Sequence, residues 1–272
     1  MHSKAPRLVT LLLAITLAVT GGTLIALNVA TASAGSASTS PQRSAAQDRV
    51  QRFERWATIT RIPNGYYYDA GQQDTHLVVT PVKHGLRYTD RHTDVLRTKP
   101  DSCDRKPAKV GLVVVCHVPR DTSPRNPLTV KVFTRLGNDY VNTSALPAAF
   151  RLYGLCDQGD DTYIGGKGND FINGAPGRDH VSGGPGKDLV RGGLNHDLVL
   201  GGPGNDTVTG LDGPDRVHGA SGKDRVGGGT GDDYIYAGPG QDFVVCNTGN
   251  DRAFAQREDR VIVSECEHVQ YS

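Results

Sequence analysis

Aspartate recurs every nine residues through the second half of the chain, without a gap. Eleven Asp residues keep this spacing, and an apolar side chain follows each of them two residues later. Carboxylate oxygens are ligands that the hard cation Ca²⁺ prefers, and no His or Cys recurs in the same register to suggest a softer metal. The pattern therefore predicts a series of calcium sites. The eleven positions are Asp161, Asp170, Asp179, Asp188, Asp197, Asp206, Asp215, Asp224, Asp233, Asp242 and Asp251.

Each nonapeptide must place its Asp by means of a loop and a strand. The cleanest copy, residues 165–173, has six loop residues that end in Asp170 and then a three-residue strand centred on Ile172. Glycine permits the positive φ angles that such a loop needs, and β-branched residues suit the strand. Asn195 replaces the Gly that otherwise stands two residues before each Asp, while Ala175, Leu211 and Ala220 are departures at the second loop position.

The composition of this segment excludes an ordinary globular core. Of the 34 Gly in the 272-residue chain, 25 lie between residues 157 and 254. The same segment has 15 Asp, no Glu and 8 Lys or Arg, a net charge of −7, whereas residues 1–156 have 20 Lys or Arg against 10 Asp or Glu. A segment with so few bulky side chains is predicted to be a repeat structure in which the backbone supplies most of the packing.

The nonapeptides resemble the RTX-type (hemolysin-type) repeat G-G-x-G-x-D-x-U-x, in which U is apolar. The resemblance covers residues 156–254 and implies an all-β fold, a right-handed parallel β-roll with two nonapeptides per turn and Ca²⁺ between successive turns. The ending, Cys246 to Asp251 and then Asp259 to Val269, is similar to the terminus of secreted actinobacterial RTX-repeat proteins. Residue i is then expected to lie beside residue i+18.

The expected spacing of the turns agrees with the size of the ion. Stacked strands lie ~4.8 Å apart, and two oxygens on opposite sides of one Ca²⁺ at ~2.4 Å are equally far apart. Six Asp on one edge and five on the other leave five and four gaps, hence at most nine sites, and we expect roughly five to nine ions. Loop carbonyls complete the expected ligand set, and they are those of Gly166, Gly168, Gly184, Gly186, Gly202 and Gly204.

Without the ion, the stacked carboxylates repel each other and the Gly-rich chain has a high entropic cost of ordering. We therefore expect this segment to fold on binding Ca²⁺.

The regions that flank the repeats have other expected roles. Residues 1–34 read as a signal peptide, with an apolar run from Leu8 to Ala30 that is either cleaved or kept as an anchor, and either outcome places the rest outside the cytoplasm. Residues 35–58 are expected to be a linker with a short helix at 45–57, and residues 255–272 a C-terminal cap. Residues 59–155 are expected to form a β-rich N-terminal cap with strands at 77–82, 85–89, 110–118 and 128–134.

Export makes the five cysteines candidates for disulfides. We expect the pairs Cys103–Cys116 and Cys246–Cys266, which leave the state of Cys156 open. Asp139 lies in a stretch that resembles a degenerate first coil of the roll. It is 22 residues before Asp161 and thus out of register, so we expect it not to bind metal.

The predicted function is that of a secreted calcium-binding protein without catalytic activity. The chain has neither an HExxH nor a G-x-S-x-G motif, and its nine His are scattered without metal-ligand spacing. Two alternatives remain: a calcium-stabilised adhesion or structural protein with a cell-wall or surface partner, and a hydrolase with an unrecognised N-terminal active site. We expect no nucleic-acid partner, and no membrane association once the signal is cleaved.

Overall fold

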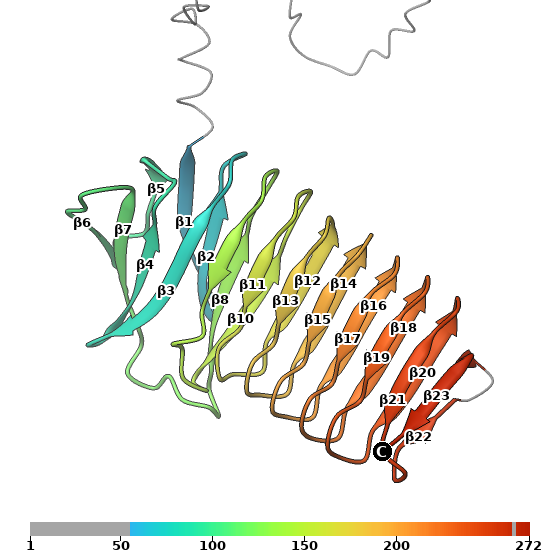
Figure 1. Cartoon of the computed structure of the whole chain (residues 1–272). Coiled ribbons are helices and arrows are strands. Elements are labelled where there is room, and N and C mark those ends of the chain that lie inside the picture. Colours follow the sequence, from blue (N-terminus) through green and yellow to red (C-terminus); the bar gives the residue numbers. More distant parts are fainter. Residues whose placement is uncertain (1–54, 263–264) are drawn as a thin grey trace, which may run out of the picture. The chain divides into compact units, whose positions relative to one another are not determined.

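The nine-residue period produces two parallel sheets that share one core. A computed structural model describes residues 55–262 and 265–272 of the chain. Consecutive nonapeptides alternate between the sheets, so that Val190 pairs with Val208 in one sheet and Val181 with Val199 in the other. Residue i therefore lies beside residue i+18, and the predicted parallel β-solenoid of the β-roll type is confirmed (Figure 1).

Each sheet extends from one end of the described region to the other. Sheet A has 11 strands, in the order β22 (Arg260–Val261), β20 (Phe243–Thr248), β18 (Arg225–Thr230), β16 (Thr207–Asp212), β14 (Leu189–Leu194), β12 (Phe171–Pro176), β10 (Phe150–Leu155), β8 (Leu128–Phe133), β2 (Gly65–Ala70), β1 (Trp56–Ile62) and β5 (Val95–Thr98). Sheet B has 12 strands, in the order β23 (His268–Tyr271), β21 (Arg252–Ala255), β19 (Tyr234–Tyr236), β17 (Arg216–His218), β15 (Leu198–Leu200), β13 (His180–Ser182), β11 (Thr162–Ile164), β9 (Tyr140–Asn142), β3 (His76–Val82), β4 (Gly85–Asp90), β7 (Leu112–His117) and β6 (Cys103–Lys106).

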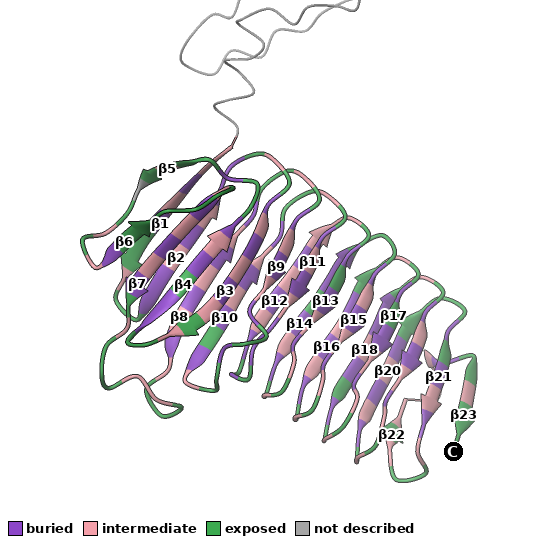
Figure 2. Cartoon of the chain, turned by 60° about the vertical axis from the view of Figure 1, so that its left-hand side comes forward, coloured by how far each residue is buried: buried purple, intermediate pink, exposed green. Residues whose placement is uncertain are grey.

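The core between the sheets is built from the apolar residue of each repeat. Val190, Val208 and Val226 point inward from sheet A, Val181 and Val199 point inward from sheet B, and none is more than 1% exposed. Burial of one such side chain stabilises the fold by roughly 1.5–3 kcal/mol. Figure 2 shows the resulting alternation of buried and less buried residues along the strands.

Strand length differs between the two sheets, which the sequence pattern did not predict. The repeats of sheet B have the expected three-residue strands, but those of sheet A have six residues, such as Thr207–Asp212. In sheet A the pairing skips one glycine, Gly210 in β16, and resumes at Leu211. Leu211 has a φ of 91°, a left-handed conformation that costs a non-glycine residue roughly 1–2 kcal/mol.

The N-terminal segment continues both sheets of the roll. The four strands expected there are present as β3, β4, β7 and β8, and the structure adds strands that lack a clear sequence signal, among them β1 and β2. Strand β8 pairs in parallel with β10, and β9 pairs with β11, so the same two sheets run through the segment and the repeats. The boundary at residue 155 stays a prediction.

The expected segments at the N-terminus lie largely outside the described residues. This holds for the signal peptide and for most of the helix predicted at 45–57. The last two residues of that helix, Trp56 and Ala57, are instead in β1, where Ala57 pairs with Ala70. Among the residues that the structure describes, no helix is long and apolar enough to span a membrane.

Both predicted disulfides are present. Cys103–Cys116 links β6 to its neighbour β7, and Cys246–Cys266 links β20 to the C-terminal tail. Cys156 is unpaired and buried.

Candidate metal centre

The eleven predicted Asp side chains form two buried ladders along the roll. Each Asp immediately precedes a strand, so the members alternate between sheet B (Asp161, Asp179) and sheet A (Asp170, Asp188). None of the eleven is more than 4% exposed. Burial of ionised carboxylates without a partner is strongly unfavourable, so the hydrogen-bond partners of these groups decide what the ladders do.

One carboxylate oxygen of each Asp is used to connect the turns. The backbone N–H of Asp188 donates to Oδ1 of Asp206 at 2.8 Å, and the N–H of Asp197 donates to Oδ1 of Asp215 at 2.8 Å. In every other pair of these Asp residues that are 18 residues apart, the N–H of the first likewise donates to Oδ1 of the second. The sequence analysis expected ions to fill the whole gap between rungs, whereas these N–H groups take half of the carboxylate oxygens.

The other carboxylate oxygen is without a hydrogen bond at nearly every rung. Among the described residues, ten of the eleven Oδ2 atoms are buried and have no hydrogen-bond partner. Asp170 differs, because its Oδ2 accepts the N–H of Gly166 at 2.7 Å. Leaving a buried acceptor unsatisfied costs roughly 1–3 kcal/mol, and more when it is charged, so a row of ten points to a cationic partner.

A glycine five residues before the Asp provides space beside this oxygen. A β-carbon on Gly201 would lie 2.9 Å from Oδ2 of Asp206 and 2.7 Å from the carbonyl oxygen of Gly219 on the next turn. We call this space, bounded by the carboxylate and the carbonyl, the cradle of the Asp. At eight glycines a β-carbon would lie within 3 Å of the Asp Oδ2, and at seven of these it would also lie within 3 Å of the carbonyl oxygen on the next turn. The eight glycines are Gly165, Gly174, Gly183, Gly192, Gly201, Gly210, Gly219 and Gly228.

Three Asp of the run have no open cradle. The residues five positions before Asp161, Asp242 and Asp251 are Cys156, Ala237 and Cys246, each of which has a β-carbon. All three are buried, at 8%, 0% and 0% exposed. The eleven Asp are therefore not equivalent, and the eight with open cradles run from Asp170 to Asp233.

The predicted carbonyl ligands lie in the loop stack, where five of the six face the glycine one turn later, and their role as ligands stays a prediction. The carbonyl of Gly166 lies 2.5 Å from the position of a β-carbon on Gly184, and the carbonyls of Gly168, Gly184, Gly186 and Gly204 lie similarly against the glycine one turn later. Gly202 follows the same loop position, but the residue one turn later is Ala220.

Close to the Oδ2 atoms the structure places carbonyls of the first loop position, such as those of Gly192, Gly210 and Gly219. The sequence analysis did not name these carbonyls. The unbroken glycine at the first loop position from 165 to 228 was the signal that could have found them.

Both ladders extend beyond the run of eleven. Asp139 donates its N–H to Oδ1 of Asp161 at 2.7 Å, so the preceding coil is indeed a first turn of the roll, lengthened to 22 residues. Its Oδ2 is also without a hydrogen bond. The residue five positions before it is the buried Thr134, which has a β-carbon where the open cradles have a glycine. That Asp139 does not bind metal stays a prediction.

At the other end, Asp242 and Asp251 donate their N–H groups at 2.9 Å to Asp259 and Glu267. The sequence analysis missed this role, because these two acids come 17 and 16 residues after their partners.

Burial raises the pKa of the ladder carboxyl groups. Desolvation is the main cause and raises the pKa of Asp188 and Asp215 to about 8, and that of Asp179 to about 7, although the backbone N–H from the adjacent turn acts in the opposite direction. Repulsion between neighbours in a ladder adds to the shift, as for Asp215, which lies between Asp197 and Asp233. A bound divalent cation acts in the opposite sense and favours the ionised form.

The donor set fits calcium. Each cradle offers one carboxylate oxygen and backbone carbonyl oxygens, a hard all-oxygen set. In the described part of the chain, no three His, Cys, Asp or Glu side chains gather as a metal cluster. Each cradle would hold a cation beside one carboxylate oxygen and, at seven of the eight, the carbonyl oxygen of the next turn. When bound, Ca²⁺ would supply positive charge to the buried Oδ2 atoms and join adjacent turns.

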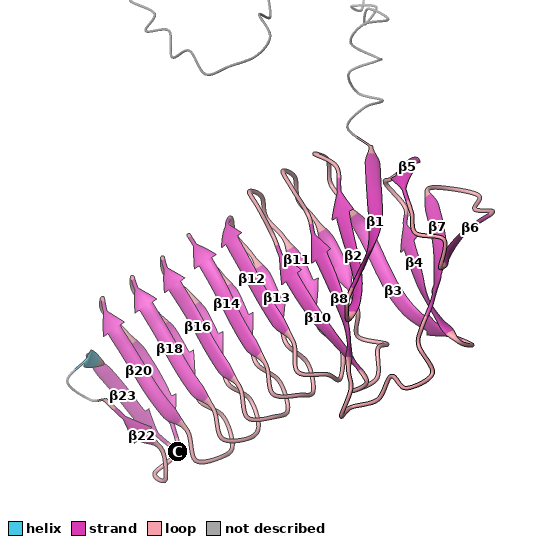
Figure 3. Cartoon of the chain, turned by 180° about the vertical axis from the view of Figure 1, so that it is seen from behind, coloured by secondary structure: helices cyan, strands magenta, loops and turns pink. Residues whose placement is uncertain are grey.

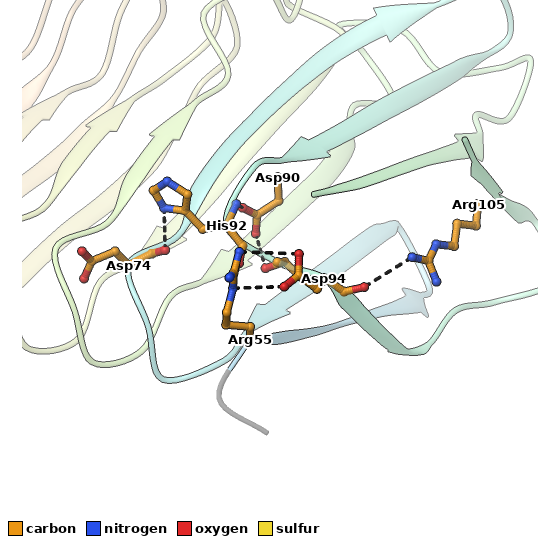
Figure 4. Close-up of polar contacts among 7 residues, drawn as sticks. Arg55, Asp74, Asp90, His92, Asp94 and Arg105 are labelled. Carbon is orange, nitrogen blue, oxygen red and sulfur yellow. Dashed lines mark hydrogen bonds and ion pairs between the residues drawn. The ribbon is translucent and has the colours of Figure 1, made fainter. Parts of the chain in front are cut away.

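The polar groups of the N-terminal segment form a structural cluster (Figure 4). Asp90, which is 1% exposed, accepts hydrogen bonds from the Tyr68 hydroxyl at 2.7 Å and the Thr93 hydroxyl at 2.6 Å, and from the N–H groups of His76 and His92. The His92 ring lies against the carbonyl of Asp74 at 2.9 Å. These bonds fix the turn between β4 and β5.

Comparison with known proteins agrees with this geometry. The family of the RTX calcium-binding nonapeptide repeat matches in four copies, at residues 157–190, 191–226, 200–233 and 218–253. No curated protein and no solved structure matches the chain.

Proposed function

Residues 157–253 consist of RTX calcium-binding nonapeptide repeats, and we propose that the protein is exported and that its β-roll then folds on binding Ca²⁺. The observation that carries the proposal is the row of ten buried Oδ2 atoms without hydrogen bonds. Seven of these ten oxygens lie at open cradles, and the eighth open cradle is that of Asp170, whose Oδ2 already accepts one N–H. A cation in such a cradle would bind the carboxylate together with the nearby carbonyl of the next turn. Eight open cradles set the number of strong sites at about eight, within the range expected from the sequence.

Folding on binding follows from the charges of the ladders. In the absence of metal, the Asp ladders would place like charges on adjacent turns in a buried environment, which opposes folding. The loops also contain many glycines, whose ordering has a high entropic cost. The core gains only one apolar side chain per repeat. Binding free energy is then also folding free energy, as in other small metal-dependent domains. The affinity expected of an extracellular module is on the order of 10⁻⁴ to 10⁻³ M.

Export is part of the proposal. The two disulfides and the basic-then-apolar N-terminus support an oxidising, calcium-rich compartment outside the cytoplasm. The proposed role requires no catalytic step. The N-terminal segment and the tail held by Cys266 then act as the two ends that cover the core of the roll.

A calcium titration tests the proposal. Far-UV circular dichroism of the full chain in chelator should lack most of the β signal, which should appear cooperatively as free Ca²⁺ rises. Mg²⁺ at the same concentration serves as the control and should be much less effective, because it demands tighter octahedral geometry. An unchanged β spectrum after chelation would contradict calcium-coupled folding.

A further inference from the structure

The outer face of sheet A carries an arginine on every second strand of the roll. Arg151, Arg191, Arg225 and Arg260 lie on β10, β14, β18 and β22, and all four are exposed. Adjacent strands lie ~4.8 Å apart, so successive arginines are separated by about 10 Å along the axis of the roll. They are also staggered along the strands: Arg225 and Arg260 share one cross-strand row, whereas Arg191 lies two residues beyond this row and Arg151 two residues before it. Figure 3 shows the sheet, in which β12, β16 and β20 separate these strands.

The four guanidinium groups are free of carboxylate partners. The four ion pairs among the described residues involve other residues. Over the flat part of the sheet, no outward-facing residue from β10 to β22 is Asp or Glu. Asp212 lies at the end of β16, where its Oδ1 accepts the hydroxyl of Thr230. Residues 157–254 have a net charge of −7, yet on this face they contribute Arg191 and Arg225 and no acid over the flat part of the sheet, and Arg151 and Arg260 flank them in sequence.

Aromatic rings between the strands position the guanidinium groups. Arg225 and Arg260 flank Phe243 in one cross-strand row, at 4.6 Å and 5.3 Å from the ring centroid. Arg191 lies 6.0 Å from the ring of Phe171, which stacks at 4.8 Å on Tyr153. The ring faces are therefore covered by other rings or by guanidinium groups. Single-stranded nucleic acids need open ring faces for base stacking, which this surface does not offer.

We propose that the outer face of sheet A binds a linear acidic polysaccharide along the axis of the roll. A guanidinium group binds a carboxylate or sulfate with two parallel hydrogen bonds, and four unpaired guanidinium groups spread along one face offer several such contacts to a single polyanionic chain. The flat face suits an extended chain rather than a compact ligand. The proposal rests on the proposed function only in that Ca²⁺ folds the roll, and it gives the adhesion alternative a partner of definite chemistry.

The opposite face provides a matched control. Sheet B carries two exposed arginines, Arg216 and Arg252, on strands of the same roll. Arg252 donates to the Tyr234 hydroxyl at 2.9 Å, and no regular series of arginines continues beyond this pair. The double variants R191Q/R225Q and R216Q/R252Q remove the same charge from sheets A and B.

Fluorescence anisotropy with the full chain in saturating Ca²⁺ tests the proposal. The probe is a labelled hyaluronan oligosaccharide, which alternates uronate and neutral sugars, and its carboxyl-reduced form is the uncharged control. We expect binding of the acidic probe only, weakened roughly tenfold or more in R191Q/R225Q and less than about twofold in R216Q/R252Q. Circular dichroism verifies that each variant is folded.

Four outcomes would overturn the proposal: no binding by a folded chain, equal binding of the carboxyl-reduced probe, equal losses in the two double variants, or tighter binding of single-stranded DNA of matched length. If the chain proves folded without Ca²⁺, the proposed calcium role fails, but the comparison of the two double variants still decides the polysaccharide proposal.

Discussion

The N–H of Asp188 donates to Oδ1 of Asp206, one turn later, at 2.8 Å, while Oδ2 of Asp206 is buried without a hydrogen bond. One side chain thus both joins two turns and leaves one oxygen for a cation. Asp→Asn at this position keeps an oxygen for the first task and removes the charge needed for the second, which allows the two roles to be separated.

Asp206→Asn should remove one calcium site, whereas Asp251→Asn should not. Asp206 has an open cradle at Gly201, but that of Asp251 is closed by the β-carbon of Cys246. Losing a charged ligand costs roughly 1.5–3 kcal/mol, so the affinity at that site should fall about tenfold or more. Isothermal titration calorimetry measures both stoichiometries. Equal losses of ions in the two variants would show that the cradles do not distinguish the sites.

Gly201→Ala and Gly227→Ala test the cradle itself with one methyl group. At Gly201 the new β-carbon would approach Oδ2 of Asp206 at 2.9 Å and the carbonyl of Gly219 at 2.7 Å. At Gly227 it would meet only the Thr209 side chain, at 3.4 Å or more, and a backbone oxygen at 3.8 Å. We expect G201A to bind one ion fewer and to need more Ca²⁺ to fold, and G227A to behave as the parent chain. Calorimetry and circular dichroism check this, and normal binding by G201A would refute the role given to the cradle.

The metal-free chain should gain structure on acidification. Burial raises the pKa of Asp188 to about 8 in the folded roll, against ~3.9 in an unfolded chain. The folded state therefore binds protons more tightly, and its stability falls as pH rises from about 4 to about 8. In chelator, the β signal should be larger at pH 5 than at pH 8.5. With Ca²⁺ the order should reverse, because protons and the cation compete for the same oxygens.

Circular dichroism at the two pH values, with and without chelator, gives the four signals required. A metal-free β signal that increases with pH would contradict this account of the ladders.

Cys156 should report calcium-dependent folding through its reactivity. Its thiol is buried, and burial together with the charges of Asp161 and Asp179 raises the pKa of Cys156 well above its usual value. Both properties protect a thiol from modification. A disulfide-exchange reagent should label it slowly in Ca²⁺ and roughly tenfold or more faster in chelator, since local unfolding exposes it. Cys156→Ser, which leaves the two disulfides, is the control and should not be labelled; fast labelling in saturating Ca²⁺ would count against a folded first turn.

The period of nine was sufficient to predict the stacking of the roll but not the use of each oxygen. Val190 and Val208 pair as expected because an 18-residue turn leaves no choice of register. The two oxygens of Asp206 have the same chemistry in the sequence, and only the position of the Asp188 amide separates them. The closed cradles were visible as Cys156, Ala237 and Cys246, yet their effect depends on where a β-carbon points, which requires the loop conformation.

The N-terminal segment was harder to predict because nothing in it repeats. Strands β3 and β4 have clear alternation, whereas Trp56 lies in the stretch 45–57 that was expected to form a short helix. In the structure, pairing of β1 with β2 determines its conformation, so tertiary contacts override a weak local pattern. Asp139 is a related case. Its turn is four residues longer than the 18-residue turns of the repeats, so the sequence spacing does not place it in the ladder, although its N–H donates to the Asp161 carboxylate as in the other turns.

A crystal structure of the calcium-loaded chain, with anomalous differences measured near the calcium signal, tests the ladders most directly. The account predicts peaks between successive turns beside the Oδ2 atoms from Asp170 to Asp233, and none beside Asp242 or Asp251. Peaks on the outer faces of the sheets, or ladders whose Oδ2 atoms approach no cation in saturating calcium, would contradict it.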